Sequence, residues 1–332
     1  MPDSAPLRTA LGPLLAAVRV DGRVARWFGE RIELVPRGAA LGRASDDLPT
    51  QALTQLLYTY YYTVSRPVLR QELDSLMRNT APRSLASQLA AANPGAGRRE
   101  GGWRCVRVRP EQGRVVVHKG DLAVSAPVQL VRPRAGGSVG PGQSVVVDTP
   151  AGSLNRSAGF YVAHSDADLD YLEPLTRMYV NVSPDGAAEW LHDACTRLNG
   201  AGLPFDLKVA NDAAHFHRCD VAVLYFPRRL VPAFWQILAP LLADRVDQLR
   251  STVPGLVLRV RPGVGVADDP ANGRSFGLDR CRAIAAGLLH AASDGPIADP
   301  LTAVSAALAD GGIDPTRPHL HSGREDVYAQ LL

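Results

Sequence analysis

One lysine in this sequence could exchange a proton during a reaction. Only two of the 36 basic residues are lysines, Lys119 and Lys208. Lys208 lies in the stretch PFDLKVAN (204–211). A lysine can lose its proton, whereas an arginine stays charged in proteins. If Lys208 lines a cleft, burial and nearby arginines disfavour its charged form and make it a candidate general base. The alternative is an exposed lysine on a strand.

Two histidines follow closely, in the stretch HFHRCD (215–220). His215 and His217 share a face if this stretch is extended, and one histidine ring is enough for a general acid. The H-x-H spacing is also found in metal sites, but the sequence holds no second cluster of ligands to complete one. The remaining interpretation is a polar segment that leads into the next strand.

A third group lies in NGRSFGLDR (272–280). Ser275 stands where a helix should begin, and Arg280 follows in its first turn. Helix N-termini present free N–H groups and a partial positive charge, which suits a phosphate, although many helices begin in this way. The chain contains no P-loop, dinucleotide fingerprint, GxSxG or HExxH motif. The sequence therefore predicts an enzyme that needs no metal or other cofactor.

Alternating side chains predict the element that carries the lysine. Phe205, Leu207 and Val209 fall on one side of a strand, and Asp206 and Lys208 fall on the other. Further strands are predicted over GFYVAH, RMYVNV, CDVAVLYF and LVLRVRP.

A helix is predicted between two of these strands. Its apolar residues share one face, and Asp185 is expected to cap its start. Those apolar residues are Ala187, Leu191, Ala194 and Leu198.

The chain divides into three predicted regions. Residues 1–98 are expected to be helical, residues 99–150 to form a small β-rich module, and residues 151–332 to form the catalytic domain. The predicted fold class is α+β, with a mixed, mainly antiparallel sheet and packed helices after the two N-terminal regions.

Composition narrows the classes of function. A net charge of +3 over 332 residues does not indicate a nucleic-acid partner. The four scattered cysteines form no CxxC pair, so neither a disulfide framework nor a zinc site is expected. No apolar run approaches the roughly 18 residues of a membrane span. The first residues do not resemble a signal peptide, and we therefore expect a cytoplasmic protein without a membrane partner.

The sequence resembles the HopA1 effector family over about residues 50–295. The shared motifs occur in matching order: ANPGAGRREGGW, GFYVA, RMYVNV, LNGAGLPFDLKV, RCDVAVLYFP and GVGVADDPANGRSFGLDRCR. Similar stand-alone bacterial proteins are implicated in class V lanthipeptide and thioviridamide-like pathways. There, a kinase resembling aminoglycoside phosphotransferases phosphorylates Ser or Thr of a precursor peptide. The HopA1-like protein is taken to eliminate that phosphate, which leaves dehydroalanine or dehydrobutyrine.

The resemblance implies a role for individual residues. Lys208 lies in the matching FDLKV motif and would be the base, as in the phosphothreonine lyases. An amine can be neutral before it removes the Cα proton and charged afterwards, which a guanidinium cannot. His215, or else His217 or Tyr225, would protonate the departing phosphate. Four residues would hold that phosphate: Arg177, Arg218, Ser275 and Arg280.

We therefore predict a phosphoserine/phosphothreonine lyase with two partners, the phosphorylated precursor peptide and the kinase. The alternative is a non-catalytic interaction protein that binds the kinase and the leader peptide. Plant-pathogen members of the family are translocated effectors, so membership alone does not require catalysis.

Overall fold

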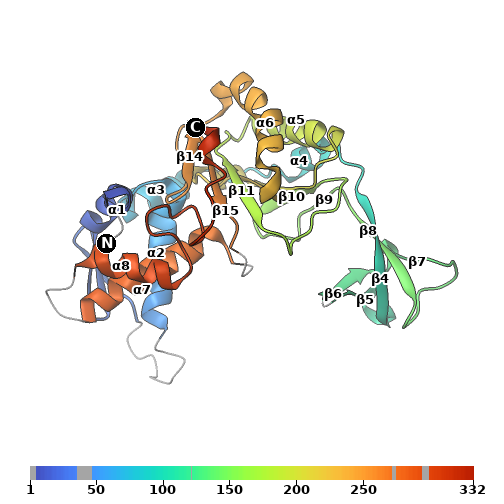
Figure 1. The fold of residues 1–332 in the computed structure, drawn as a ribbon, viewed down its shortest axis with the longest axis horizontal. Coiled ribbons are helices and arrows are strands. Elements are labelled where there is room, and N and C mark those ends of the chain that lie inside the picture. Colours follow the sequence, from blue (N-terminus) through green and yellow to red (C-terminus); the bar gives the residue numbers. More distant parts are fainter. Residues whose placement is uncertain (1–4, 36–46, 121, 271–273, 294–298) are drawn as a thin grey trace.

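A seven-stranded antiparallel sheet forms the centre of the protein (Figure 1), and the fold is α+β as predicted. The structure is a computed structural model that describes residues 5–35, 47–120, 122–270, 274–293 and 299–332. The strand order is β14-β15-β11-β13-β12-β10-β9. The strands are β9 (Gly152–Ser153), β10 (Phe160–His164), β11 (Leu175–Val180), β12 (Asp206–Ala210), β13 (Ala222–Pro227), β14 (Leu258–Arg261) and β15 (Val264–Asp268).

Three helices cover one face of this sheet. They are α4 (Ala86–Ala92), α5 (Ala187–Gly200) and α6 (Val231–Asp244). Leu207 and Val209 of β12 are fully buried in the core beneath these helices. The alternation of apolar residues thus predicted the correct inward side of this strand.

Helix α5 confirms the predicted helix but not its predicted cap. The N-cap residue is Gly186, and no side chain caps the helix. The chain turns into the helix one residue later than expected, and the exposed carboxylate of Asp185 instead pairs with Arg83 at 2.9 Å.

The opposite face packs in one buried cluster with helices of the N-terminal and C-terminal regions. These are α1 (Ala5–Ala17), α2 (Leu48–Tyr60), α7 (Phe276–Ser293) and α8 (Pro300–Asp310). Helix α3 (Arg70–Asn79) follows α2 in the chain. Tyr179 and Val223 of the sheet share a buried cluster with Leu57 and Phe276. Helices therefore pack on both faces of the sheet, while Lys208 and Tyr225 remain partly exposed.

A small sheet interrupts the predicted helical region. Its strands are β1 (Val18–Asp21), β2 (Val24–Trp27) and β3 (Glu30–Glu33). Gly22 and Gly29 form the tight turns between them, with φ of 56° and 85°. Strands of four residues carry too few alternating positions to stand out against the helical pattern around them.

The predicted β-rich module is a five-stranded antiparallel sheet, which Figure 1 shows at the opposite end of the molecule from α1, α7 and α8. It has the order β6-β5-β4-β8-β7 and a small core around Trp103 and Val115. Its strands are β4 (Arg98–Arg109), β5 (Arg114–Lys119), β6 (Leu122–Pro127), β7 (Val131–Pro133) and β8 (Ser144–Thr149).

Short 3₁₀ segments complete the described chain. They are η2 (Tyr62–Val64), η3 (Pro110–Gln112), η4 (Val128–Leu130), η5 (Ala213–His217), η6 (Arg228–Leu230), η7 (Val246–Gln248) and η8 (Ala329–Leu331). Among the described residues, no helix combines the length and the apolar character that crossing a membrane requires.

Candidate functional site

Strand register brings the predicted lysine, tyrosine and arginine to one face of the main sheet. Lys208 of β12 pairs with Val223 of β13. In the next row of that face, Asp206 pairs with Tyr225, and Tyr225 pairs with Arg177 of β11. Directly paired residues project to the same face, and neighbouring strands lie about 4.8 Å apart. The side chains of Lys208, Tyr225 and Arg177 can therefore reach one ligand.

Lys208 is half-buried and its amine lies over an aromatic ring. Nζ is 4.1 Å from the centroid of the Phe160 ring. Within the described part of the chain, no carboxylate oxygen lies within 4.0 Å of Nζ. The amine thus has no ion-pair partner there, and the ring face is placed to interact favourably with a positive charge on Nζ.

His215 lies close to the same place. Its ring packs on Gly159, the residue before Phe160: a Cβ built there would stand 3.2 Å from His215 Cε1. Gly159 has φ +78°, a backbone conformation that suits glycine. The ring of His217 turns to the backbone instead, with Nδ1 at 2.8 Å from the Ala214 carbonyl oxygen, and burial lowers the pKa of His217. No group of three potential metal ligands occurs among the described residues.

Arg177 is held firmly on the sheet face and is only 9% exposed. Its Nε forms an ion pair with Asp269, and its Cζ lies 5.1 Å from the centroid of the Tyr225 ring. Burial opposes the charge, but the neighbouring Tyr225, Tyr179 and Asp269 outweigh it, so the pKa of Arg177 stands above its usual value. This guanidinium remains charged, as a phosphate-binding group must.

The start of α7 lies beside Arg177. Nη2 of Arg177 donates to the carbonyl oxygen of Arg274 at 2.9 Å, directly before the half-buried Ser275. Gly277 lets the aromatic ring of Tyr62 rest on the first turn, because a Cβ there would lie 2.2 Å from that ring. The structure thus places the start of α7, with Ser275, next to Arg177.

Arg280 occupies a different position from the other predicted phosphate ligands. Its side chain is fully buried. Nη1 donates to Asp279 Oδ2 at 2.9 Å, and Nε donates to the Pro318 carbonyl oxygen at 3.2 Å. These contacts join α7 to the C-terminal segment behind the helix start.

Arg218 is fixed by a carboxylate and a tyrosine. It donates to both oxygens of Asp220 at 2.7 Å, and Nη2 also donates to the Tyr58 hydroxyl at 2.8 Å. Tyr58 stacks on Tyr62 with ring centroids 5.4 Å apart. Burial and the nearby Asp220 raise the pKa of Tyr58 to about 12, so its hydroxyl stays neutral. This chain of contacts connects Arg218 to the start of α7.

A buried histidine and carboxylate, which no sequence motif marked as a pair, lie on the same sheet face as the lysine. His164 and Asp206 are each 3% exposed, and His164 Nδ1 lies 2.7 Å from Asp206 Oδ1. The Tyr171 hydroxyl also donates to Asp206, and Arg156 Nη2 lies 3.3 Å from the same carboxylate. Burial favours the neutral acid, but these three partners outweigh it and hold the pKa of Asp206 below its usual value. Asp206 was predicted to share the face of Lys208, whereas its pairing with His164 depends on a strand register that the sequence does not reveal.

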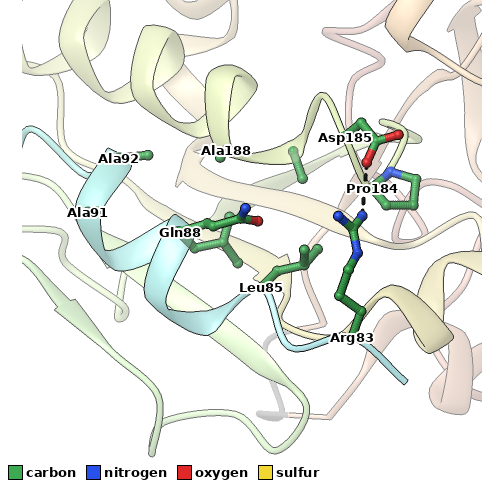
Figure 2. A pocket seen from close by; sticks show the side chains of 10 residues that line it. Arg83, Leu85, Gln88, Ala91, Ala92, Pro184, Asp185 and Ala188 are labelled. Carbon is green, nitrogen blue, oxygen red and sulfur yellow. Dashed lines mark hydrogen bonds and ion pairs between the residues drawn. The ribbon is translucent and has the colours of Figure 1, made fainter. Parts of the chain in front are cut away.

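A groove between α4 and the start of α5 lies away from these residues (Figure 2). Its volume is about 430 Å³, and its rim carries the exposed ion pair between Arg83 and Asp185. Gln88 and Ala188 line it from the two helices, on the opposite face of the sheet from Lys208. This groove offers only one solvated ion pair, which contributes little, whereas the Lys208 face carries an amine, a guanidinium and a phenol.

Comparisons with known proteins bear on the same region. The model of the HopA1 effector protein family matches residues 152–320, slightly more than half of the chain, and this stretch contains every predicted site residue. The effector protein from Pseudomonas syringae pv. tomato strain DC3000 is 16% identical, with a TM-score of 0.46 over 82% of this chain and 90% of that one. The effector protein from Pseudomonas syringae pv. syringae strain 61 is 13% identical, with a TM-score of 0.45 over 84% and 93%. No curated protein matches the chain.

Proposed function

The chain belongs to the HopA1 effector protein family, and on that premise we propose that it is a phosphoserine/phosphothreonine lyase. Its substrate would be a precursor peptide phosphorylated by a kinase, in the biosynthesis of a ribosomal peptide natural product. The product would carry dehydroalanine or dehydrobutyrine. The supporting observation is the Lys208 amine, which has no carboxylate partner among the described residues and shares a sheet face with Arg177 and Tyr225.

Lys208 is the base in this proposal. Nζ removes the Cα proton of the phosphorylated residue, the electron pair of that C–H bond forms the Cα–Cβ double bond, and the Cβ–O bond breaks. The phosphate leaves with the electron pair of the broken bond. The amine becomes positive as this happens, and the Phe160 ring face stabilises the new charge.

The phosphate would be held by Arg177, Arg218 and the start of α7 at Ser275. A helix N-terminus and planar guanidinium groups are both suited to phosphate oxygens. Arg280, buried behind the helix start, would act through the position of α7 rather than through direct contact. The charge of the leaving group is then neutralised in a partly desolvated place, where such contacts are strongest.

Three groups can protonate the departing phosphate. His215 and Tyr225 are two of the three predicted acids, the third, His217, being turned to the Ala214 carbonyl oxygen, and the structure adds His164. Because Asp206 lies 2.7 Å from Nδ1 of His164, it orients that ring and leaves Nε2 as the atom that can exchange a proton. Three single variants identify the acid: His164→Gln, His215→Gln and Tyr225→Phe. Only the loss of the true acid should slow elimination more for a poor leaving group than for a good one, because a poor leaving group depends more on protonation.

The decisive experiment uses the two lysines of the chain. Purified protein is incubated with a phosphoserine peptide without metal or nucleotide, and mass spectrometry follows the loss of phosphoric acid. We expect Lys208→Arg to lower the rate by about 10² to 10⁴-fold, since a general base contributes roughly that much. The matched control, Lys119→Arg, should be as active as the wild type, because Lys119 lies on the small β module.

The same spectrum separates the other candidates. A hydrolase would leave a product heavier by one water than the eliminated peptide. A non-catalytic interaction protein would leave the phosphopeptide unchanged while binding the kinase or the leader peptide. Normal elimination by Lys208→Arg would remove Lys208 from the role of base.

A further inference from the structure

The five-stranded sheet of residues 98–150 carries an arginine-rich face. Strand register separates its two sides, because directly paired residues project together. One side holds the small apolar core with Trp103, Cys105 and Val117. On the other side lie six arginines, which we call the arginine face: Arg99, Arg104, Arg107, Arg109, Arg114 and Arg132.

Few carboxylates balance this face. Among the described residues of the sheet, Asp148 is the one acid that projects from it, and it pairs with Arg99 at 3.3 Å and Arg132 at 2.6 Å. In the described part of the chain, no carboxylate oxygen lies within 4.0 Å of the other four arginines. Three of those four, Arg104, Arg107 and Arg114, are exposed. The arginine face thus has guanidinium groups available for an anionic partner.

The module accounts for the whole positive excess of the protein. Residues 98–150 contain nine of the 36 basic residues and four of the 33 acidic ones. The remaining chain therefore has 27 basic and 29 acidic residues and is slightly acidic. The mild net charge of +3 hides this local concentration.

We propose that the arginine face binds an acidic segment of the substrate peptide, at a distance from the residues that are modified. This inference rests on the proposed lyase function, because it supplies a peptide as the ligand. Arg107 and Arg109 of β4 are alternate residues, which lie about 6.6 Å apart on a strand, and Arg114 of β5 pairs directly with Arg109. Alternate side chains of an extended acidic peptide have the same spacing, so carboxylates can meet successive guanidinium groups.

The face is less suited to a nucleic acid. Single strands bind to surfaces where aromatic rings stack on the bases. The described residues that project from the arginine face include no Phe, Trp or Tyr, and the nearest aromatic, Trp103, points into the core. A positively charged face without aromatic rings for base stacking therefore suits an acidic peptide better than a single-stranded nucleic acid.

The binding test uses a fluorescein-labelled synthetic peptide of alternating Glu and Thr, and fluorescence anisotropy at low and physiological ionic strength. Replacing Arg104, Arg107 and Arg114 together by Gln should weaken binding about tenfold, since each exposed pair contributes modestly. The wild-type affinity should fall as salt rises. The matched control replaces three exposed arginines of the first small sheet, Arg19→Gln, Arg23→Gln and Arg26→Gln, and should bind as the wild type does.

Three results would overturn the docking inference: no binding by the wild type, equal loss in both triple variants, or tighter binding of a single-stranded oligonucleotide of the same charge. The assay needs no catalysis, so a failed lyase proposal leaves its outcome readable. In the elimination assay, the arginine-face variant should raise KM for a phosphoserine peptide that carries the acidic segment and leave kcat unchanged. The same variant should leave both KM and kcat unchanged for a phosphoserine peptide without the acidic segment. An equal change for the two peptides would contradict the inference even if elimination is normal.

Discussion

Replacing Asp206 by Asn should destabilise the protein strongly, because this carboxylate is the centre of a buried network. Asp206 is 3% exposed and accepts from the ring of His164 and the hydroxyl of Tyr171, with Arg156 at 3.3 Å. The amide keeps the shape of the side chain but removes its charge and turns one acceptor into a donor. At least one of the three partners then loses its bond inside the protein.

The size of the effect follows from burial. Removing one partner of a buried ion pair costs about 3 to 5 kcal/mol. The amide retains one acceptor oxygen, and we therefore expect the lower end, a loss of about 3 kcal/mol in the free energy of unfolding. The matched control is Asp185→Asn, whose ion pair with Arg83 has side-chain exposures of 87% and 53%. Exposed pairs contribute about 0 to 1 kcal/mol, so this control should unfold almost as the wild type does.

Urea unfolding at pH 7 measures both variants, with the m-value showing whether the change lies in stability alone.

The dependence of this stability on pH provides a second test. The folded pKa of Asp206 is lowered, so its charge stabilises the protein above the ordinary carboxylate pKa of about 3.9. That stabilisation is lost as the pH falls from there through the lowered folded pKa.

The free-energy difference between wild type and Asp206→Asn should therefore be constant near neutral pH and shrink below about pH 4. A loss no larger than that of Asp185→Asn would refute the argument. So would a difference that does not change with pH down to acid unfolding.

Two further predictions concern the packing around the site. Gly277→Ala should lower the free energy of unfolding by about 1 to 3 kcal/mol, because its Cβ would overlap the Tyr62 ring at 2.2 Å. Gly200→Ala, with nothing within 4 Å of its Cβ, should be neutral or stabilising, and equal melting temperatures for the two variants would contradict this. Phe160→Leu should keep the fold but lower kcat of elimination severalfold, because it removes the ring that stabilises the charged Lys208. An unchanged kcat would show that the ring has no such role.

The local pattern of the sequence was enough to place Lys208. Alternation put Leu207 and Val209 on one side of the strand and Asp206 and Lys208 on the other, and Leu207 and Val209 do lie in the core beneath α4, α5 and α6. This works because side chains alternate between the two faces of a strand, so the apolar face is visible in the sequence. The other face is also covered, and Asp206 is buried there. The short strand β2 (Val24–Trp27) was missed for the converse reason, since four residues contain only two periods.

Contacts between distant parts of the chain could not be predicted in the same way. Asp206 meets His164 across 42 residues, because β10 lies beside β12 although β11 comes between them in the chain. Arg177 meets Asp269 across 92 residues, because β11 lies beside β15 although β12, β13 and β14 come between them in the chain. The residue types that can pair are visible in the sequence, but the order of strands that selects the pairs is not.

Arg177 and Arg218 share one arrangement, which Lys208 lacks. Arg177 and Arg218 each engage a carboxylate through Nε, and both use Nη2 for a second fixed partner. In the described part of the chain, neither Nη1 has a hydrogen-bond partner, so each guanidinium is oriented while donors remain for a ligand. The carboxylate of Asp206 orients His164 in the same manner.

Lys208 is the exception, because it has an aromatic ring beneath it and no carboxylate beside it among the described residues. A phosphate-binding arginine benefits from a carboxylate that fixes its position, since its charge is never in question. A base would be impaired by the same neighbour, because an adjacent carboxylate favours the protonated form more strongly than a ring face does. The different partners of these cations therefore follow from the different roles we propose for them.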